Sequence, residues 1–321
     1  MQREGSPWQN LGTVYAKELA EHLSSIRMLV LSLLIFVIGC VAVYFAIESI
    51  RQTTAEDPFV LLKLFTSARS SILSLVFILG FLIPLMAIAL GFDAINGEHN
   101  RRTLSRILSQ PIYRDALLAG KFLAALTTLG IGLLCLWMIV IGFGVKELGV
   151  PPSGEEIARA FVFLLITLAY AGTWLALAML LSIVTRSAAT AVLVALGIWL
   201  FLTLLWPMLV PGIAGAIAPS DPRYALFGLQ DPTTVQWAEV LRRLSPNDLF
   251  NGAAVALLAP DTRQVSQIID LSQWQGAVLG APLPLTESLA IAWPQAVALI
   301  AGVIVLFVAG YIVFQRQEVR A

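Results

Sequence analysis

Charged residues are scarce in this sequence. Asp, Glu, Lys and Arg make up 12% of 321 residues, whereas about a quarter is usual in soluble domains. The formal net charge is zero, so no basic surplus is available to neutralise phosphates, and we expect no nucleic-acid binding. There are only two histidines, His22 and His99, and two cysteines. Because none of them has a further His or Cys at ligand spacing, we predict no metal site, and Cys40 and Cys135 are predicted to be buried packing residues.

Motifs of nucleotide and peptide hydrolysis are also missing. Gly120-Lys121 is the only Gly-Lys pair, and a phosphate-binding loop would need Gly in place of Asp115 and Ser or Thr in place of Phe122. Neither HExxH nor GxSxG occurs. We therefore predict that the chain is not an enzyme and holds no cofactor. Lys121 is predicted to be a lipid-headgroup anchor at a membrane surface.

Apolar residues are abundant. They account for 58% of the chain, and the mean hydropathy is +0.85. Six apolar runs are long enough to cross a hydrocarbon core of about 30 Å. These predicted transmembrane helices cover residues 28–47, 71–92, 116–143, 157–184, 189–210 and 289–314. The sequence therefore predicts an all-α polytopic membrane protein that lies in the lipid bilayer.

The middle of each run contains no Asp, Glu, Lys, Arg or His. Ion-coupled carriers and proton pumps usually need such groups at mid-depth for coordination or proton relay. An ion-coupled secondary carrier is therefore disfavoured, although it stays an alternative.

Residues 1–27 precede the first run and are amphipathic. Lys17, Glu18, Glu21 and His22 lie mostly off the apolar stripe, which indicates a helix in the plane of the membrane interface. The stripe consists of Trp8, Leu11, Tyr15, Leu19, Leu23 and Ile26.

Residues 93–121 form a polar segment between the second and third runs. Leu104, Ile107 and Leu108 recur at helical spacing, and Arg101 and Arg102 lie on the other face. This pattern predicts a short amphipathic helix at the membrane surface that could dock a soluble protein.

Residues 211–288 separate the fifth and sixth runs. We predict an irregular stretch over 211–232 and helices over 234–244 and 249–258, with Ser245 as a cap and Pro246 at the first helical position. This segment either shields the spans or contacts cargo, and the sequence leaves both possibilities open.

Basic residues are unevenly distributed between the two sides. The segments on the side of the termini contain 11 Lys and Arg and 7 Asp and Glu, against 8 and 13 on the opposite side. By the positive-inside rule we predict that both termini are cytoplasmic and that 211–288 is extracytoplasmic.

Residues 93–121 also carry a recognisable order of short motifs: Gly97-Glu98, Thr103-Leu104, Leu108-Ser109-x-Pro111, Arg114 and Gly120-Lys121. This order resembles the first cytoplasmic loop of the ABC-2 exporter permeases. The stretch Ala16 to Leu19 resembles their N-terminal elbow helix. Leu244-Ser245-Pro246, Trp274 and Trp293-Pro294 resemble the branch that includes the permease for maturation of nitrous-oxide reductase.

The resemblance implies a single transmembrane domain over 1–321 in a prokaryotic cytoplasmic (inner) membrane, working as a homodimer with two copies of an ABC ATPase. ATP and Mg²⁺ would bind that ATPase and not this chain. The loop would be the coupling element, with the ATPase met by Glu98, Arg101, Arg102, Leu104 and Leu108. A non-transporting scaffold that assembles with an ATPase is the other alternative.

Overall fold

The structure, a computed structural model, describes residues 10–51, 59–66, 74–100, 113–149, 151–185, 187–219, 231–259 and 283–316. Within these ranges every regular element is a helix, as predicted. The elements are α1 (Leu11–Ser24), α2 (Ile26–Arg51), α3 (Lys63–Thr66), α4 (Leu75–Gly91), α5 (Asn96–Asn100), α7 (Arg114–Leu148), α8 (Gly154–Val184), α9 (Ala188–Leu200), the π-helix η2 (Phe201–Leu205), α10 (Trp206–Ile217), α12 (Pro232–Arg242), α13 (Pro246–Leu258) and α14 (Leu285–Arg316).

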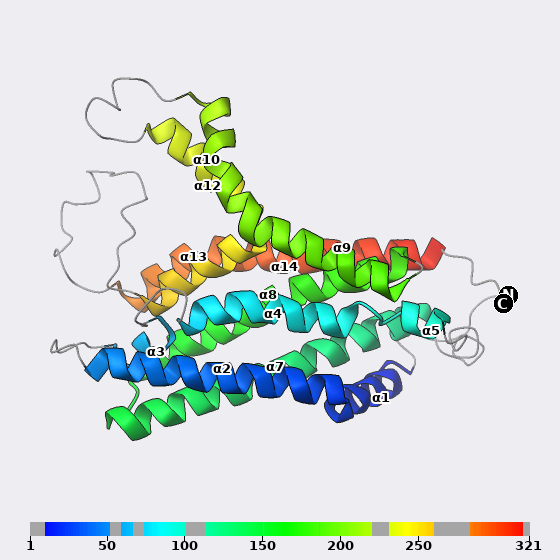
Figure 1. The fold of residues 1–321 in the computed structure, drawn as a ribbon, viewed down its shortest axis with the longest axis horizontal. Coiled ribbons are helices and arrows are strands. Elements are labelled where there is room, and N and C mark those ends of the chain that lie inside the picture. Colours follow the sequence, from blue (N-terminus) through cyan, green and yellow to red (C-terminus); the bar gives the residue numbers. More distant parts are fainter. Residues whose placement is uncertain are drawn as a thin grey trace.

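Six helical segments of the described residues are long and apolar enough to cross a membrane, which confirms the predicted number and positions of the spans. They are α2, α4 with α5, α7, α8, α9 through α10, and α14. The spans of the bundle run along its long axis, with α1 and α5 at one end and α3 at the other (Figure 1). We call these the α1 end and the α3 end.

Local signals explain where several spans begin and end. Ser153 caps α8 through a reciprocal capping box with Glu156, and Ser74 caps α4 by accepting from Phe77 N. Gly149, with φ of 70°, ends α7 in the left-handed conformation that glycine adopts at little cost.

The fifth span continues further than predicted. We expected an irregular stretch from Pro211, but α10 runs through that proline to Ile217. It follows a π-helical turn, a local variation often found inside longer helices. Trp206 Nε1 donates to the carbonyl of Leu241 at 2.9 Å and so holds α10 against α12. The two helices lean away from the bundle together (Figure 1).

The helices predicted in the long connection are confirmed. Asp231 caps α12, and Ser245 caps α13 with Pro246 at the first helical position. α13 packs into the bundle against α4, α8 and α14. Phe250 of α13 is fully buried and stacks on Tyr170, with ring centroids 4.6 Å apart.

Arg159 is fully buried near the α3 end. Its guanidinium pairs with Glu155 at 2.8 Å and donates to Ser288 Oγ and to the carbonyls of Leu257 and Leu283. One side chain therefore ties α8 to the end of α13 and the start of α14.

The prediction that the cysteines are buried is wrong. Cys40 and Cys135 are exposed on the surfaces of α2 and α7. Both surfaces belong to apolar spans, so a small apolar side chain fits the lipid side of the chain as well as its core.

Candidate functional site

One side of the candidate site is formed where α1 packs closely against α7. Val14 and Glu18 are the buried residues of α1, whereas Leu23 and nearby Ile26 stay exposed. Gly120 permits the approach, because a Cβ there would lie 2.8 Å from Val14 Cγ1. The predicted helix over this stretch is confirmed. Its position in the membrane interface stays a prediction, which the exposed apolar side chains favour.

A shared ammonium group lies at the centre of the site. Lys121 Nζ is 2.9 Å from Glu18 Oε2 on α1 and 2.8 Å from Glu98 Oε1 on α5. The side chains of Lys121 and Glu18 are 7% exposed, and that of Glu98 is 14% exposed. The predicted headgroup role of Lys121 is therefore wrong, because both neighbouring carboxylates already occupy its ammonium group. Glu18 is likewise buried, although we had placed it off the packing stripe.

The start of the polar segment 93–121 is also fixed to the bundle. Ser182 Oγ of α8 accepts hydrogen bonds from the backbone N–H groups of Ile95 at 3.1 Å and Asn96 at 3.2 Å. Asp93 pairs with Arg27 of α2 at 2.8 Å. The spans α2 and α8 thus hold the first turn of this segment.

The end of the same segment is held by the last span. Arg114 donates to the carbonyls of Phe314 and Gln315 at the end of α14, where a cation is favoured by the helix dipole. Asp115 accepts a hydrogen bond from the Gln315 side chain. A displacement of the segment would therefore reach α1, α2, α7, α8 and α14 directly.

Four of the five predicted coupling residues, Arg101, Arg102, Leu104 and Leu108, lie outside the described residues, as does most of the predicted amphipathic helix. The fifth is Glu98, which points into the bundle toward Lys121, although we expected it to face a soluble partner. Its role in coupling stays a prediction.

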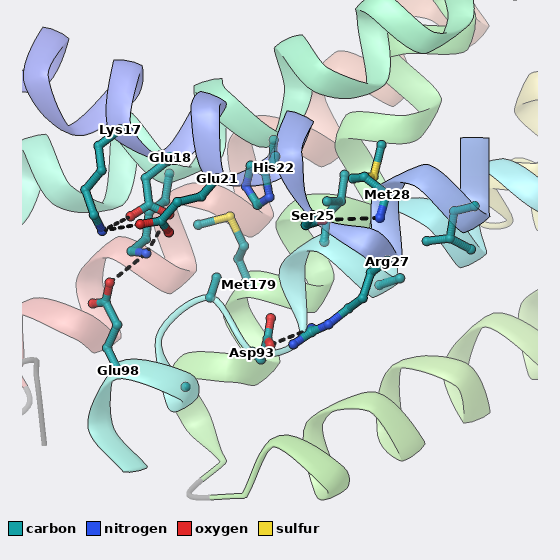
Figure 2. A pocket seen from close by; sticks show the side chains of 17 residues that line it. Lys17, Glu18, Glu21, His22, Ser25, Arg27, Met28, Asp93, Glu98 and Met179 are labelled. Atoms are coloured by element: carbon teal, nitrogen blue, oxygen red, sulfur yellow. Dashed lines mark hydrogen bonds and ion pairs between the residues drawn. The ribbon is translucent and has the colours of Figure 1, made fainter. Parts of the chain in front are cut away.

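A cavity of about 660 Å³ lies beside this cluster, between α1, the start of α2, the α4–α5 turn, α7 and α8. Figure 2 shows Lys17, Glu21, His22, Arg27 and Asp93 around it. Its deeper wall is apolar and consists of Met28, Leu31, Ala89, Leu90, Ala125 and Met179. We call it the charged cavity.

Electrostatics differ between neighbouring groups of α1. Burial opposes ionisation of Glu18, but Lys121 and Lys17 outweigh burial and hold the pKa of that carboxyl below its usual value. Burial lowers the pKa of His22, so its neutral form is favoured near pH 7. Among the described residues no group of three His, Cys, Asp or Glu is placed to hold a metal ion.

Sequence reasoning identified Glu98, Arg114 and Lys121 as members of one ordered pattern, and the structure brings Glu98 and Lys121 into contact. It missed Glu18 and Ser182. No signal in the sequence marks Glu18 as buried, because periodicity does not show which helix covers that face of α1. No sequence signal distinguishes Ser182 from the other small residues of its span.

Six apolar helices, together with a polar segment that contacts four of them and α1, define a multi-pass membrane protein. A sequence model of the ABC-2 family transporter proteins matches residues 12–319, and the chain therefore belongs to this family.

Two curated relatives carry a more specific description. A protein of Pseudomonas aeruginosa described as a probable ABC transporter permease protein NosY is 29% identical over 317 residues, covering 96% of this chain and 98% of the relative. A Stutzerimonas stutzeri protein with the same description is 27% identical over 266 residues, covering 79% and 82%. The resemblance to ABC-2 permeases noted in the sequence is thus confirmed.

Proposed function

We propose that this chain is the permease subunit of an ABC exporter, which moves a substrate outward with energy from ATP hydrolysed by a separate ATPase. In this proposal residues 93–121 are the coupling segment, in a cytoplasmic (inner) membrane with both termini in the cytoplasm. The working unit has two copies of this chain and two of the ATPase, which binds ATP and Mg²⁺.

One observation carries the proposal within the family. The polar segment begins and ends in contacts with α1, α2, α7, α8 and α14, so a push on it moves the bundle and not only the segment. A loop that served only to connect two spans would need no such contacts. The absence of Asp, Glu, Lys, Arg and His from the middle of the predicted spans also favours an external energy source over ion coupling.

The direct test is co-expression with a tagged ABC ATPase from the same genome, followed by transport in proteoliposomes. We expect co-purification and ATP-dependent movement of cargo away from the ATPase side. Arg101→Ala with Arg102→Ala should reduce recovery of the ATPase and leave insertion unchanged, because exposed charges contribute little to stability. Unchanged recovery of the ATPase would show that these residues have no coupling role.

A transport measurement separates this function from the alternatives. A membrane scaffold would bind the ATPase but give no ATP-dependent flux. An ion-coupled carrier would transport without the ATPase and would respond to an ion gradient. Leu104→Ala and Leu108→Ala extend the test of ATPase recovery to the apolar face of the predicted helix.

A further inference from the structure

A second, narrower cavity lies one helical turn beyond the charged cavity along the same three helices. Leu31, Leu90 and Ala125 line the charged cavity. One helical turn deeper on each helix, Ile35, Met86 and Leu129 line an apolar crevice of about 10 Å³. Ser32, Phe36, Ile83, Gly132 and Leu133 complete this crevice. The two cavities therefore lie in line along these helices, and we call them together the path, with a charged end and an apolar end.

The charged end offers both signs of charge. Four carboxylates and three cations line it, and Glu18, Glu98 and Lys121 largely saturate one another. The more accessible groups form two surface pairs, Lys17 with Glu21 at 3.2 Å and Arg27 with Asp93 at 2.8 Å. A ligand would exchange these pairs, which contribute little to stability, for contacts of its own. An anionic ligand would meet a surplus of carboxylates. A ligand with a phosphate beside an ammonium group would match Arg27 and Lys17 with one part and Glu21 and Asp93 with the other.

The apolar end has space for only about one water-sized group, so a chain must displace side chains to enter, and the crevice is open beside α7. A Cβ added at Gly132 would meet no atom within 4 Å. The other walls are aliphatic or aromatic apart from Ser32, and the unbranched, flexible Met86 can move to admit a chain. A chain that comes from the bilayer or from detergent is already out of water, so what it gains in this crevice is close packing against the side chains of α2, α4 and α7.

We propose that this path is a binding site for one zwitterionic phospholipid with a primary ammonium headgroup, taken from the leaflet at the α1 end. The phosphate lies at Arg27 and Lys17, the ammonium at Glu21 and Asp93, and an acyl chain enters the crevice between α2, α4 and α7. The cavity volume of about 660 Å³ is in the range of known small-molecule sites. The proposal concerns lipid binding and does not depend on an ATPase or on transport.

Matched variants test both ends of the site by native mass spectrometry of the full-length protein in detergent. The probe is dioleoyl phosphatidylethanolamine added to delipidated protein. Arg27→Gln should weaken binding about tenfold, since it removes a charge-assisted contact. Its control is Arg51→Gln, at the other end of α2, which breaks a similar surface pair with Glu147 at 2.9 Å. The control should bind as the wild type does.

Gly132→Leu fills the crevice and should also weaken lipid binding about tenfold, because the acyl chain loses its packing contacts with α2, α4 and α7. Gly142→Leu is its control: it lies on the same helix, its Cβ also meets no atom within 4 Å, and it lines neither cavity. If Gly132→Leu unfolds, Ser32→Leu fills the crevice from α2 and must give the same loss.

Two competitors distinguish the ligand class. Glycerophosphoethanolamine, the same headgroup without chains, should not displace the lipid at equal concentration. Effective displacement would show a site for a free phosphate ester and overturn the proposal. Preference for anionic phosphatidylglycerol, or equal lipid binding by all four variants, would overturn it as well.

Discussion

The most demanding prediction about the stability of the site concerns Lys121. Replacing it with Met keeps the length of the side chain but leaves Glu18 and Glu98 without their shared cation, in positions where water reaches little of either carboxylate. Removing one partner of a buried ion pair typically costs about 3–5 kcal/mol. We therefore expect Lys121→Met to lower the unfolding temperature by roughly 5–15 °C in detergent.

The matched control is Lys17→Met. Lys17 also contacts Glu18, at 3.2 Å, but its side chain is 57% exposed. A pair that is open to water contributes at most about 1 kcal/mol, so this variant should shift the unfolding temperature little. A triple variant that combines Lys121→Met with Glu18→Gln and Glu98→Gln removes the two carboxylate charges as well. It should recover most of the stability lost in Lys121→Met.

The assay is thermal unfolding followed by tryptophan fluorescence at pH 7.5 on size-selected protein. The result that would refute the reasoning is a Lys17→Met variant as unstable as Lys121→Met. Failure of the triple variant to recover stability would refute it equally, because the cost would then come from lost packing and not from buried charge.

Three further changes test other parts of the structure. The pKa of His22 is lowered in the folded protein, so the unfolded chain takes up the proton first and the wild type loses stability as the pH falls below about 6.5. His22→Gln should remove this contribution and make the unfolding temperature less dependent on pH in that range, which thermal scans at several pH values measure. Gly120→Ala should loosen α1 and raise its hydrogen exchange, since the new Cβ meets Val14, and adding Val14→Ala should restore protection. Arg159→Met should cost about 3–5 kcal/mol in thermal unfolding, with no rescue by Lys, because one ammonium cannot reproduce the fork of contacts to Glu155, Leu257 and Leu283.

The sequence predicts the spans well because a bilayer imposes a length and a composition that few other environments require. The same reasoning failed at Pro211, where we took a proline as the end of a helix. Packing of α10 against α12, fixed by Trp206, keeps that helix intact. Local propensity could not reveal a contact made 35 residues further along the chain.

The candidate site was only partly predictable for a similar reason. Lys121 stands at the edge of an apolar run, as interfacial anchors do, when only its neighbours in sequence are considered. Its actual environment is set by α1, more than 90 residues earlier, which brings Glu18 to it across Gly120. Sequence periodicity identifies which residues share a face of a helix but not which other helix covers that face.

The coupling role of residues 93–121 is the central claim, and site-directed crosslinking to the ATPase tests it most directly. Arg102→Cys in a variant lacking Cys40 and Cys135 is combined with single cysteines on the surface of the co-purified ATPase, with Asp231→Cys on the long connection as the control. We predict a crosslink from position 102 whose yield changes when ATP binds, and none from position 231. A crosslink from position 231 with none from 102 would contradict both the orientation and the coupling role.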